Sequence, residues 1–380
     1  QRTADKVAEL SSRTGIHVHY SLKANSDRRL NEIISSRGIG ADCVSGDEID
    51  FAVSCGYDPK KIFFAGVAKS DKEICQAFQV GIGAFVVESL EEIEIVSDIA
   101  SRLGRRAPMS LRINPNIDPH THHYITTGLY EDKFGISDRS FDEAVAMVKD
   151  NPYIDFYGLQ FHIGSQIMEV ADVVRLECEK VSKIVGRFEA TGLVVKNIDL
   201  GGGLGVDYDD PDGHPLPDFD CWFKTINDNL KRRPDQTLHI EPGRSIVAQS
   251  GSLITEVLYV KKGENKRFLM VDAGMNDLIR PALYGAYHKI ENLTAHYEDN
   301  DSRQTRVYDV VGPVCESADC FGKERPLAKS RRGDRIAIRS AGAYGQVMAS
   351  HYNMRPIAPS VYSDRVTEAP RRKDYFASVD

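Results

Sequence analysis

The sequence lacks any apolar run that approaches the ~20 residues needed to cross a bilayer, so we expect no membrane association and a protein in solution. Its seven cysteines are an odd number, and no two of them form a CxxC pair. This pattern predicts reduced thiols, a cytoplasmic location and no metal site. Low-complexity stretches and short tandem repeats are absent as well. The net charge of −8 argues against nucleic acid as a partner.

The N-terminus lacks an initiating methionine and a signal peptide. The chain begins with Gln1, so we expect further residues upstream of it. Its 380 residues suit two domains, or one large barrel with an appendage.

The first two thirds of the chain alternate between two patterns. Apolar residues recur at helical spacing, as in Ile93, Val96 and Ile99, and 4–10 could form a helix before the first strand. Between such segments lie short β-branched or aromatic runs, at residues 18–22, 39–44, 62–65, 84–87, 109–113, 157–163, 196–200 and 237–240. Eight strands alternating with helices predict a (β/α)8 TIM barrel, an α/β fold, over residues 1–245. An open doubly wound sheet is the alternative.

The pattern changes after Arg244. Four strand-like runs follow with little helical signal between them, at residues 253–260, 268–271, 307–311 and 335–338. We therefore predict a C-terminal, mostly antiparallel β domain over residues 246–380. The long segment 115–139 inside the barrel predicts a functional loop, because long loops in compact domains are commonly functional.

Polar residues and glycines mark the ends of four predicted strands. The active site of a TIM barrel lies at the carboxyl ends of its strands. The residues there are Lys23 after the first strand, His162 and Ser165 after the sixth, Gly201, Gly202 and Gly203 after the seventh, and Glu241 after the eighth. We therefore expect these residues to share one rim.

This set has a chemical interpretation. Three consecutive glycines let backbone N–H groups converge on an anion, and the loops after strands seven and eight commonly hold phosphate in barrels; a tight turn is the alternative. Lys23 ends an apolar strand, where desolvation would lower its pKa and favour it as an amine nucleophile; a solvated lysine is the alternative. A reactive lysine beside a phosphate site predicts pyridoxal 5′-phosphate as the cofactor.

Glu241 and His162 complete the predicted cofactor site. A carboxylate that faces the pyridine nitrogen keeps that nitrogen protonated, so that the ring accepts electrons better. The alternative for Glu241 is an ion pair with Arg244. A histidine ring at position 162 could stack on the cofactor, and a core histidine is its alternative.

The motifs of the chain resemble one family. They are Tyr20-Ser-Leu-Lys-Ala-Asn25, His162-Ile-Gly-Ser-Gln166, Gly201–Gly203, Glu241-Pro-Gly-Arg244, Val314-Cys-Glu-Ser317 and Ala341-Gly-Ala-Tyr344. The ordered set resembles the fold-type III, alanine-racemase-like pyridoxal-phosphate decarboxylases. His122-His-Tyr-Ile-Thr-Thr-Gly128 and Lys133-Phe-Gly-Ile136 resemble their diaminopimelate branch. The resemblance runs nearly end to end, and it implies that an N-terminal strand of the β domain is missing from the chain.

The resemblance implies a role for each motif residue. Lys23 would bind the cofactor covalently, His162 would stack on its ring, Glu241 would face its nitrogen, and Cys315 would protonate the product carbon. The cofactor and its phosphate would be seated by Ser165, Gly201, Gly202, Gly203, Gly243, Arg244 and Tyr344. The substrate would be held by Arg244, Arg280, Tyr284, Glu316 and Tyr344. Family members are homodimers in which Cys315 and Glu316 would come from across the interface.

The implied reaction is decarboxylation of meso-2,6-diaminopimelate to L-lysine. Its substrate has a second amino-acid head, so recognition needs cations for the carboxylate and an anion for the ammonium, as Arg280 and Glu316 would provide. Taken alone, Arg280 could be a surface arginine and Cys315 a buried thiol. An ornithine- or arginine-type decarboxylase would carry aspartate where Glu316 stands. A racemase, a non-catalytic pyridoxal-phosphate carrier and a relative recruited to secondary metabolism are the remaining alternatives.

Overall fold

A computed structural model describes residues 1–117, 133–296 and 304–365. The predicted barrel is confirmed: eight parallel strands close on themselves in chain order. They are β1 (Ile16–Ser21), β2 (Gly40–Cys43), β3 (Ile62–Phe64), β4 (Ala84–Val87), β5 (Ala107–Arg112), β6 (Ile154–Gln160), β7 (Asn197–Asp199) and β8 (Thr237–Ile240). Closure comes from β8 pairing with β1, with Val18 opposite Ile240. The alternative of an open doubly wound sheet is therefore wrong.

Helices surround the barrel. The predicted helix at 4–10 is confirmed as α1 (Arg2–Thr14), which packs against β1 and α8. The others are α2 (Arg28–Ser35), α3 (Gly46–Ser54), α4 (Asp71–Val80), α5 (Leu90–Arg102), α6 (Phe141–Val148), α7 (Val170–Ala190), α8 (Phe219–Asn229) and the short α9 (Arg244–Val247). Ile93, Val96 and Ile99 lie buried on α5, as their spacing predicts.

The sixth strand differs most from its predicted position. It was predicted at 157–163 and runs from Ile154 to Gln160. Phe161 and Ile163 are fully buried although they follow the strand, so their apolar character extends the strand-like pattern into the loop. His162 therefore lies two residues beyond the strand end.

The second sheet has six strands in the order β11-β14-β9-β10-β12-β13. They are β9 (Leu253–Lys262), β10 (Arg267–Val271), β11 (Ile290–Asn292), β12 (Thr305–Val311), β13 (Cys320–Ala328) and β14 (Arg335–Ile338). All pairs are antiparallel except β10 with β12, which confirms the mostly antiparallel prediction. The sequence did not predict β11, which has three residues, or β13, which is rich in charged residues and contains Pro326.

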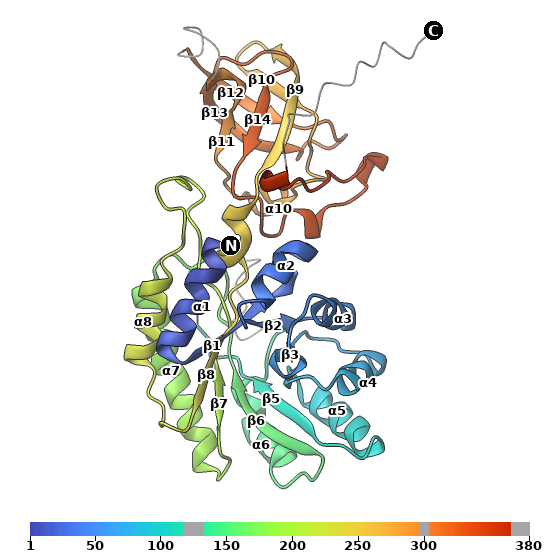
Figure 1. The fold of residues 1–380 in the computed structure, drawn as a ribbon, viewed down its shortest axis with the longest axis vertical. Helices are drawn as coiled ribbons and strands as arrows, with labels where there is room; N and C mark the ends of the chain where they lie inside the picture. Colours follow the sequence, from blue (N-terminus) through green and yellow to red (C-terminus); the bar gives the residue numbers. More distant parts are fainter. Residues whose placement is uncertain (118–132, 297–303, 366–380) are drawn as a thin grey trace.

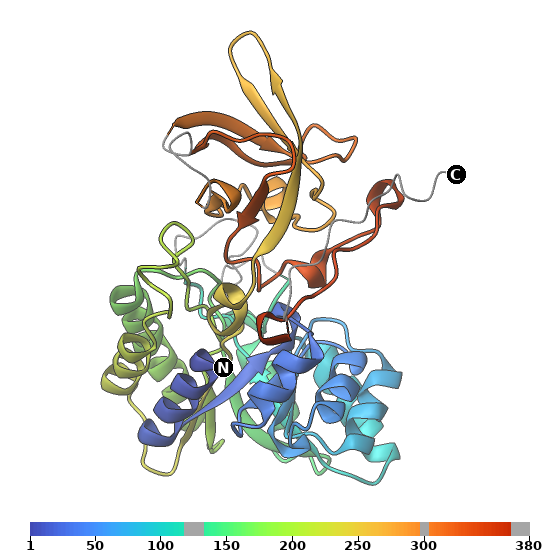
Figure 2. The same cartoon turned by 45° about the horizontal axis from the view of Figure 1, so that its top comes forward.

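The second sheet stands over the rim of the barrel at which α2 begins and α9 follows β8 (Figures 1 and 2). Two hydrogen bonds tie the first β–α turn to the end of the sheet. The Tyr344 N–H donates to the Ala24 carbonyl at 2.8 Å, and the Asn25 side chain donates to the Gly342 carbonyl at 2.7 Å. The carboxyl ends of the strands therefore face the second sheet.

The far end of the barrel interior holds a pair of histidines. His19 Nε2 lies 3.0 Å from His239 Nδ1, and the His19 ring stacks on Phe63 with centroids 3.9 Å apart. Both histidines are nearly inaccessible to solvent. The side chains of His19, His239 and Phe63 therefore fill the barrel interior on the side away from the carboxyl ends of the strands.

Two glycines allow a matched test of strand spacing. A Cβ on Gly158 in β6 would lie 2.0 Å from the Asn197 carbonyl oxygen on β7, whereas a Cβ on Gly186, exposed on α7, would meet nothing within 4 Å. We expect Gly158→Ala to lower the free energy of unfolding by about 1–3 kcal/mol through overpacking. Gly186→Ala should raise it by about 0.5–1 kcal/mol through helix propensity. Chemical denaturation measures the free energy of unfolding of both variants. Equal changes in the two variants would contradict the explanation by close strand spacing at Gly158.

Candidate active site

Lys23 lies in a short 3-10 turn, Leu22–Ala24, that follows β1. Its side chain is 44% exposed, and its Nζ lies 3.8 Å from Asp42 Oδ2. Burial lowers the pKa of Lys23, but Asp42, Tyr344 and Glu241 raise it, and the net shift is upward. The prediction of a lowered pKa is therefore wrong for the protein without its cofactor, because the neighbouring carboxyl groups outweigh desolvation. Lys23 is a charged amine held at the rim.

Glu241 follows β8 and is buried at the floor of the site. Its Oε2 accepts a hydrogen bond from Gln160 Nε2 at 2.9 Å, and its Oε1 has no donor among the described residues. Burial, with the charges of Asp199 and Asp42, raises the pKa of Glu241 well above its usual range. The alternative of an ion pair with Arg244 does not occur between these two described side chains.

Gly201, Gly202 and His162 lie together on one side of the candidate site. A Cβ on Gly201 would lie 2.4 Å from the Phe161 carbonyl oxygen, and one on Gly202 would lie 2.3 Å from the Glu241 carbonyl oxygen. Gly201 also has a φ of +66°, which favours glycine, so the three glycines do form a tight turn. This turn does not decide whether their N–H groups also bind phosphate. The Gly202 N–H donates to His162 Nδ1 at 3.2 Å. The neutral His162 ring therefore carries its proton on Nε2.

Arg244 is buried on α9 and is held by two hydroxyl groups. Its guanidinium donates to Ser165 Oγ at 3.0 Å and to the Tyr208 hydroxyl at 2.8 Å, and it lies 4.9 Å from the ring centroid of Tyr344. Tyr344 has a φ of +54°, a conformation that costs a non-glycine residue of order 1–3 kcal/mol. Gly243, which precedes Arg244, packs against Ala24 and Ser21, the turn that carries Lys23.

Arg280 begins α10 (Arg280–Tyr284) and is buried rather than on the surface, so the surface-arginine alternative is wrong. His288 Nδ1 donates to the Arg339 carbonyl at 2.8 Å, which leaves Nε2 to accept from Arg280 at 2.7 Å. Burial and the Arg280 charge lower the pKa of His288 to about 3, in keeping with a neutral acceptor. The Arg280 guanidinium also lies 4.7 Å from the Tyr208 ring centroid. Tyr208 thus contacts both arginines and His288 holds Arg280, and no motif in the sequence indicated either residue.

Tyr284 ends α10 and is half-buried. Cys315 and Glu316 lie in the exposed turn between β12 and β13. The backbone N–H of Cys315 donates to Asn353 Oδ1 at 2.8 Å. The alternative of a buried thiol at position 315 is therefore wrong. All seven cysteines lie in the described part of the chain, and each is unpaired.

Several polar residues inside the barrel were not predicted. Arg112 at the end of β5 donates to Glu88 at 2.9 Å in a buried ion pair. Asp42, Gln160 and Asp199 each lie buried at or next to a strand end. The position of the active site at the carboxyl ends of barrel strands could have indicated them, because each lies where its strand reaches that rim.

The predicted functional loop is described only in part. The motif at 122–128 lies outside the described residues. At its far side, the Gly135 N–H donates to Glu88 at 3.2 Å, and Ile136 pairs with Ile113. The loop therefore returns to the ends of β4 and β5.

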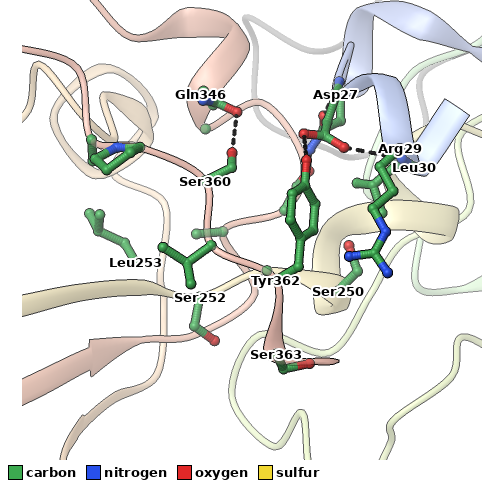
Figure 3. A pocket seen from close by; sticks show the side chains of 18 of the residues that line it. Asp27, Arg29, Leu30, Ser250, Ser252, Leu253, Gln346, Ser360, Tyr362 and Ser363 are labelled. Carbon is green, nitrogen blue, oxygen red and sulfur yellow. Dashed lines mark hydrogen bonds between the residues drawn. The ribbon is translucent and has the colours of Figure 1, made fainter. Parts of the chain in front are cut away.

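A cavity of about 510 Å³ lies beside the start of α2, where Asp27, Arg29 and Leu30 line it. It is also lined by Asn25 and Gly342, and the segment 357–364 covers it. The Tyr362 hydroxyl donates to Asp27 (Figure 3). Arg29 pairs with Asp364. These contacts fasten the segment to the start of α2, next to the candidate site.

The residues present fit pyridoxal phosphate. Glu241 Oε1 is a buried acceptor without a donor among the described residues, as a protonated ring nitrogen requires. Gly201 and Gly202 pack against the backbone carbonyls of Phe161 and Glu241, which holds the three-glycine turn after β7 next to Glu241. Lys23 supplies the amine at the open end. These three features define a protein of the pyridoxal-phosphate class.

Comparisons with known proteins agree with the assignment to the pyridoxal-phosphate class. Residues 2–248 match the family model described as pyridoxal-dependent decarboxylase, pyridoxal binding domain. A curated diaminopimelate decarboxylase of Bacteroides thetaiotaomicron is 48% identical over 358 residues, which cover 94% of this chain and 91% of that protein. The chain belongs to the diaminopimelate decarboxylase family of pyridoxal-dependent decarboxylases. A crystal structure of diaminopimelate decarboxylase from Helicobacter pylori complexed with L-lysine superposes with a TM-score of 0.84 at 42% identity, over 93% of this chain and 88% of that one. A Chlorella virus arginine decarboxylase shares the fold at 20% identity.

None of the helices within 1–117, 133–296 and 304–365 has the length and apolar character to cross a membrane. The same ranges contain no cluster of three or more histidine, cysteine or acidic side chains arranged to hold a metal ion.

Proposed function

We propose that the protein decarboxylates meso-2,6-diaminopimelate to L-lysine and carbon dioxide with pyridoxal phosphate as its cofactor. The 48% identity to a diaminopimelate decarboxylase over 94% of the chain carries this proposal. Lys23 and Glu241 at the barrel rim, with the buried Arg280 beside the same Tyr208 that holds Arg244, support it. None of the observations favours an ornithine or arginine substrate, because the arginine decarboxylase shares only the fold.

The cofactor residues have separate tasks in this proposal. Lys23 would hold the cofactor through its aldehyde. His162 would lie against the cofactor ring, and Glu241 would accept the proton of the ring nitrogen. The backbone N–H groups of Gly201–Gly203, with Ser165, Gly243, Arg244 and Tyr344, seat the phosphate. When bound, the cofactor accepts the electron pair that carbon dioxide leaves on the α-carbon.

The remaining residues hold the substrate and return a proton. Arg280, fixed by His288 and flanked by Tyr208, binds the distal carboxylate together with Arg244, Tyr284 and Tyr344. Glu316 pairs with the distal ammonium, and Cys315 gives its thiol proton to the α-carbon after carbon dioxide has left. Since Cys315 and Glu316 lie in an exposed turn, we propose that they act in the site of a partner subunit in a homodimer.

Three further proposals concern organisation. The barrel domain ends near residue 245, where α9 leads into the second sheet. The enzyme works in the cytoplasm, in keeping with seven unpaired cysteines. The negative net charge argues against nucleic acid as a partner.

A substrate comparison tests the activity. Purified protein loaded with pyridoxal phosphate should form lysine and carbon dioxide from meso-diaminopimelate. Ornithine and arginine lack the distal carboxylate, so each should react at least ~100-fold more slowly in kcat/KM, the effect of two or more lost charge-assisted bonds. Product chromatography with carbon dioxide release measures both. Faster turnover of ornithine or arginine would overturn the substrate assignment.

A further inference from the structure

Arg280 and Arg244 are two buried cations that lack a carboxylate partner. Each residue is 5% exposed, and within the part of the chain that the structure describes neither guanidinium forms an ion pair with a carboxyl group. Arg280 Nε is also buried and has no acceptor among the described residues. A buried charge is costly unless an opposite charge or hydrogen bonds compensate it, so this pair of arginines requires an anionic ligand.

Arg280 is held by a neutral acceptor instead. His288 is fully buried, and its Nδ1 lies 2.8 Å from the Arg339 carbonyl, which can only accept a hydrogen bond. The ring proton is therefore on Nδ1, and Nε2 accepts from Arg280 at 2.7 Å. Burial, with the charge of Arg280, lowers the pKa of His288 to about 3, which agrees with this tautomer.

Tyr208 is the second neutral contact of the two arginines. Its ring centroid lies 4.7 Å from the Arg280 guanidinium, and its hydroxyl accepts from Arg244 at 2.8 Å. The rings of Tyr208 and His288 pack edge to face with centroids 5.0 Å apart. Tyr208 follows β7 in the barrel, whereas His288 precedes β11 in the second sheet. Both domains therefore contribute to the position of the two cations.

The nearest acids in this junction pair with other cations. Asp212 lies 3.1 Å from the Lys289 ammonium and 2.7 Å from the Arg339 guanidinium, and Glu291 lies 2.6 Å from Arg339. These ion pairs hold the loop after β7 against the second sheet. The charge of Arg280 is thus not used up by the contacts that join the two domains.

We propose that His288 is a positioning residue that fixes Arg280 through a neutral acceptor and thereby leaves the charge of Arg280 for the distal carboxylate of the ligand. This inference rests on the proposed function, since it explains how that carboxylate is recognised. A carboxylate in the place of His288 would hold the guanidinium as firmly, but it would neutralise the charge and repel the ligand. A neutral imidazole orients the guanidinium and keeps its charge available.

Two amide variants separate the contacts of the ring. The asparagine amide reaches the Nδ1 side of an imidazole, so His288→Asn keeps a donor for the Arg339 carbonyl but leaves Arg280 without its acceptor. Glutamine reaches the Nε2 side, so His288→Gln restores the acceptor. We expect His288→Asn to raise the KM for meso-diaminopimelate by at least ~10-fold and to change kcat by less than ~3-fold, because the lost contact orients the bound ligand in the ground state and the transition state alike. His288→Gln should stay within ~3-fold of the wild type in both constants.

Ligand binding identifies the group that Arg280 recognises. L-lysine keeps one complete amino-acid head of diaminopimelate, and cadaverine is L-lysine without its carboxylate. Calorimetric titration of the cofactor-loaded protein should show at least ~10-fold weaker binding of L-lysine to His288→Asn than to His288→Gln, and equal binding of cadaverine to both. His214→Asn is the matched control, since His214 is exposed and pairs with Asp207; it should bind L-lysine as the wild type does.

The tautomer can be measured without cofactor or substrate. Nitrogen NMR of the cofactor-free protein at pH 7 should show a neutral His288 ring with its proton on Nδ1, assigned by the loss of its signals in His288→Gln. A proton on Nε2 or a doubly protonated ring would overturn the inference. If His288→Asn does not fold, as judged by circular dichroism, this measurement decides alone.

The outcomes separate this inference from the proposed function. Equal L-lysine affinities of the two amide variants, or an equal loss of cadaverine binding in His288→Asn, would refute the role of His288 in a protein that still forms lysine from diaminopimelate. If the wild type neither binds L-lysine nor forms it, the proposed function is wrong and the inference falls with it.

Discussion

Lys23→Ala is expected to lower the rate of lysine formation by roughly 10³-fold or more, because the variant loses the covalent attachment of its cofactor. Lys60→Ala is the matched control, since Lys60 lies in the exposed turn Pro59–Lys61 before β3, at the opposite end of the barrel. Borohydride reduction of the loaded wild-type protein followed by peptide mapping should place the pyridoxyl group on Lys23. A label on another lysine would refute the assignment of Lys23.

Mixing two inactive variants is expected to restore activity. If Cys315 serves the partner's site, each site of a homodimer contains Lys23 of one chain and Cys315 of the other. A mixed dimer of Lys23→Ala and Cys315→Ala then has both lesions in one site and an intact second site. With random exchange of equal amounts, about half the dimers are mixed, so roughly a quarter of all sites should work.

The measurement is lysine release before and after subunit exchange, with exchange itself followed by mass-tagged chains. Each variant incubated alone under the same conditions is the control. If exchange occurs and no activity returns, every site keeps a lesion and the shared site is wrong. Cys315 would then act within its own chain or have no part in the reaction.

The strands and the principal site residues could be predicted because both follow local rules. The runs at 84–87, 237–240 and 335–338 agree with β4, β8 and β14 to the residue, because polar or small residues follow each run at once. Lys23 and Glu241 could be predicted because the carboxyl ends of all parallel strands lie at the same end of a barrel. Asp199 obeys the same rule but was hidden by the glycines that follow it.

The remaining features depend on contacts between distant segments. Tyr208 and His288 lie 80 positions apart, and they matter only because folding packs their rings edge to face next to Arg280. The net pKa shift of Lys23 depends on Asp42 and Glu241, which come from two other strands. The parallel pairing of β10 with β12 also joins segments that the sequence does not mark as neighbours.

The hydrogen bond between Asn25 and the Gly342 carbonyl spans 317 positions of the chain. Folding slows as contacts become less local, because the chain between the two partners must be brought together first. During synthesis, the turn that carries Lys23 leaves the ribosome long before the segment that fastens it. The nascent barrel must therefore wait for the end of the second sheet before its reactive lysine takes its final place, so premature chain termination near residue 330 should yield a protein with a lysine but without a working site.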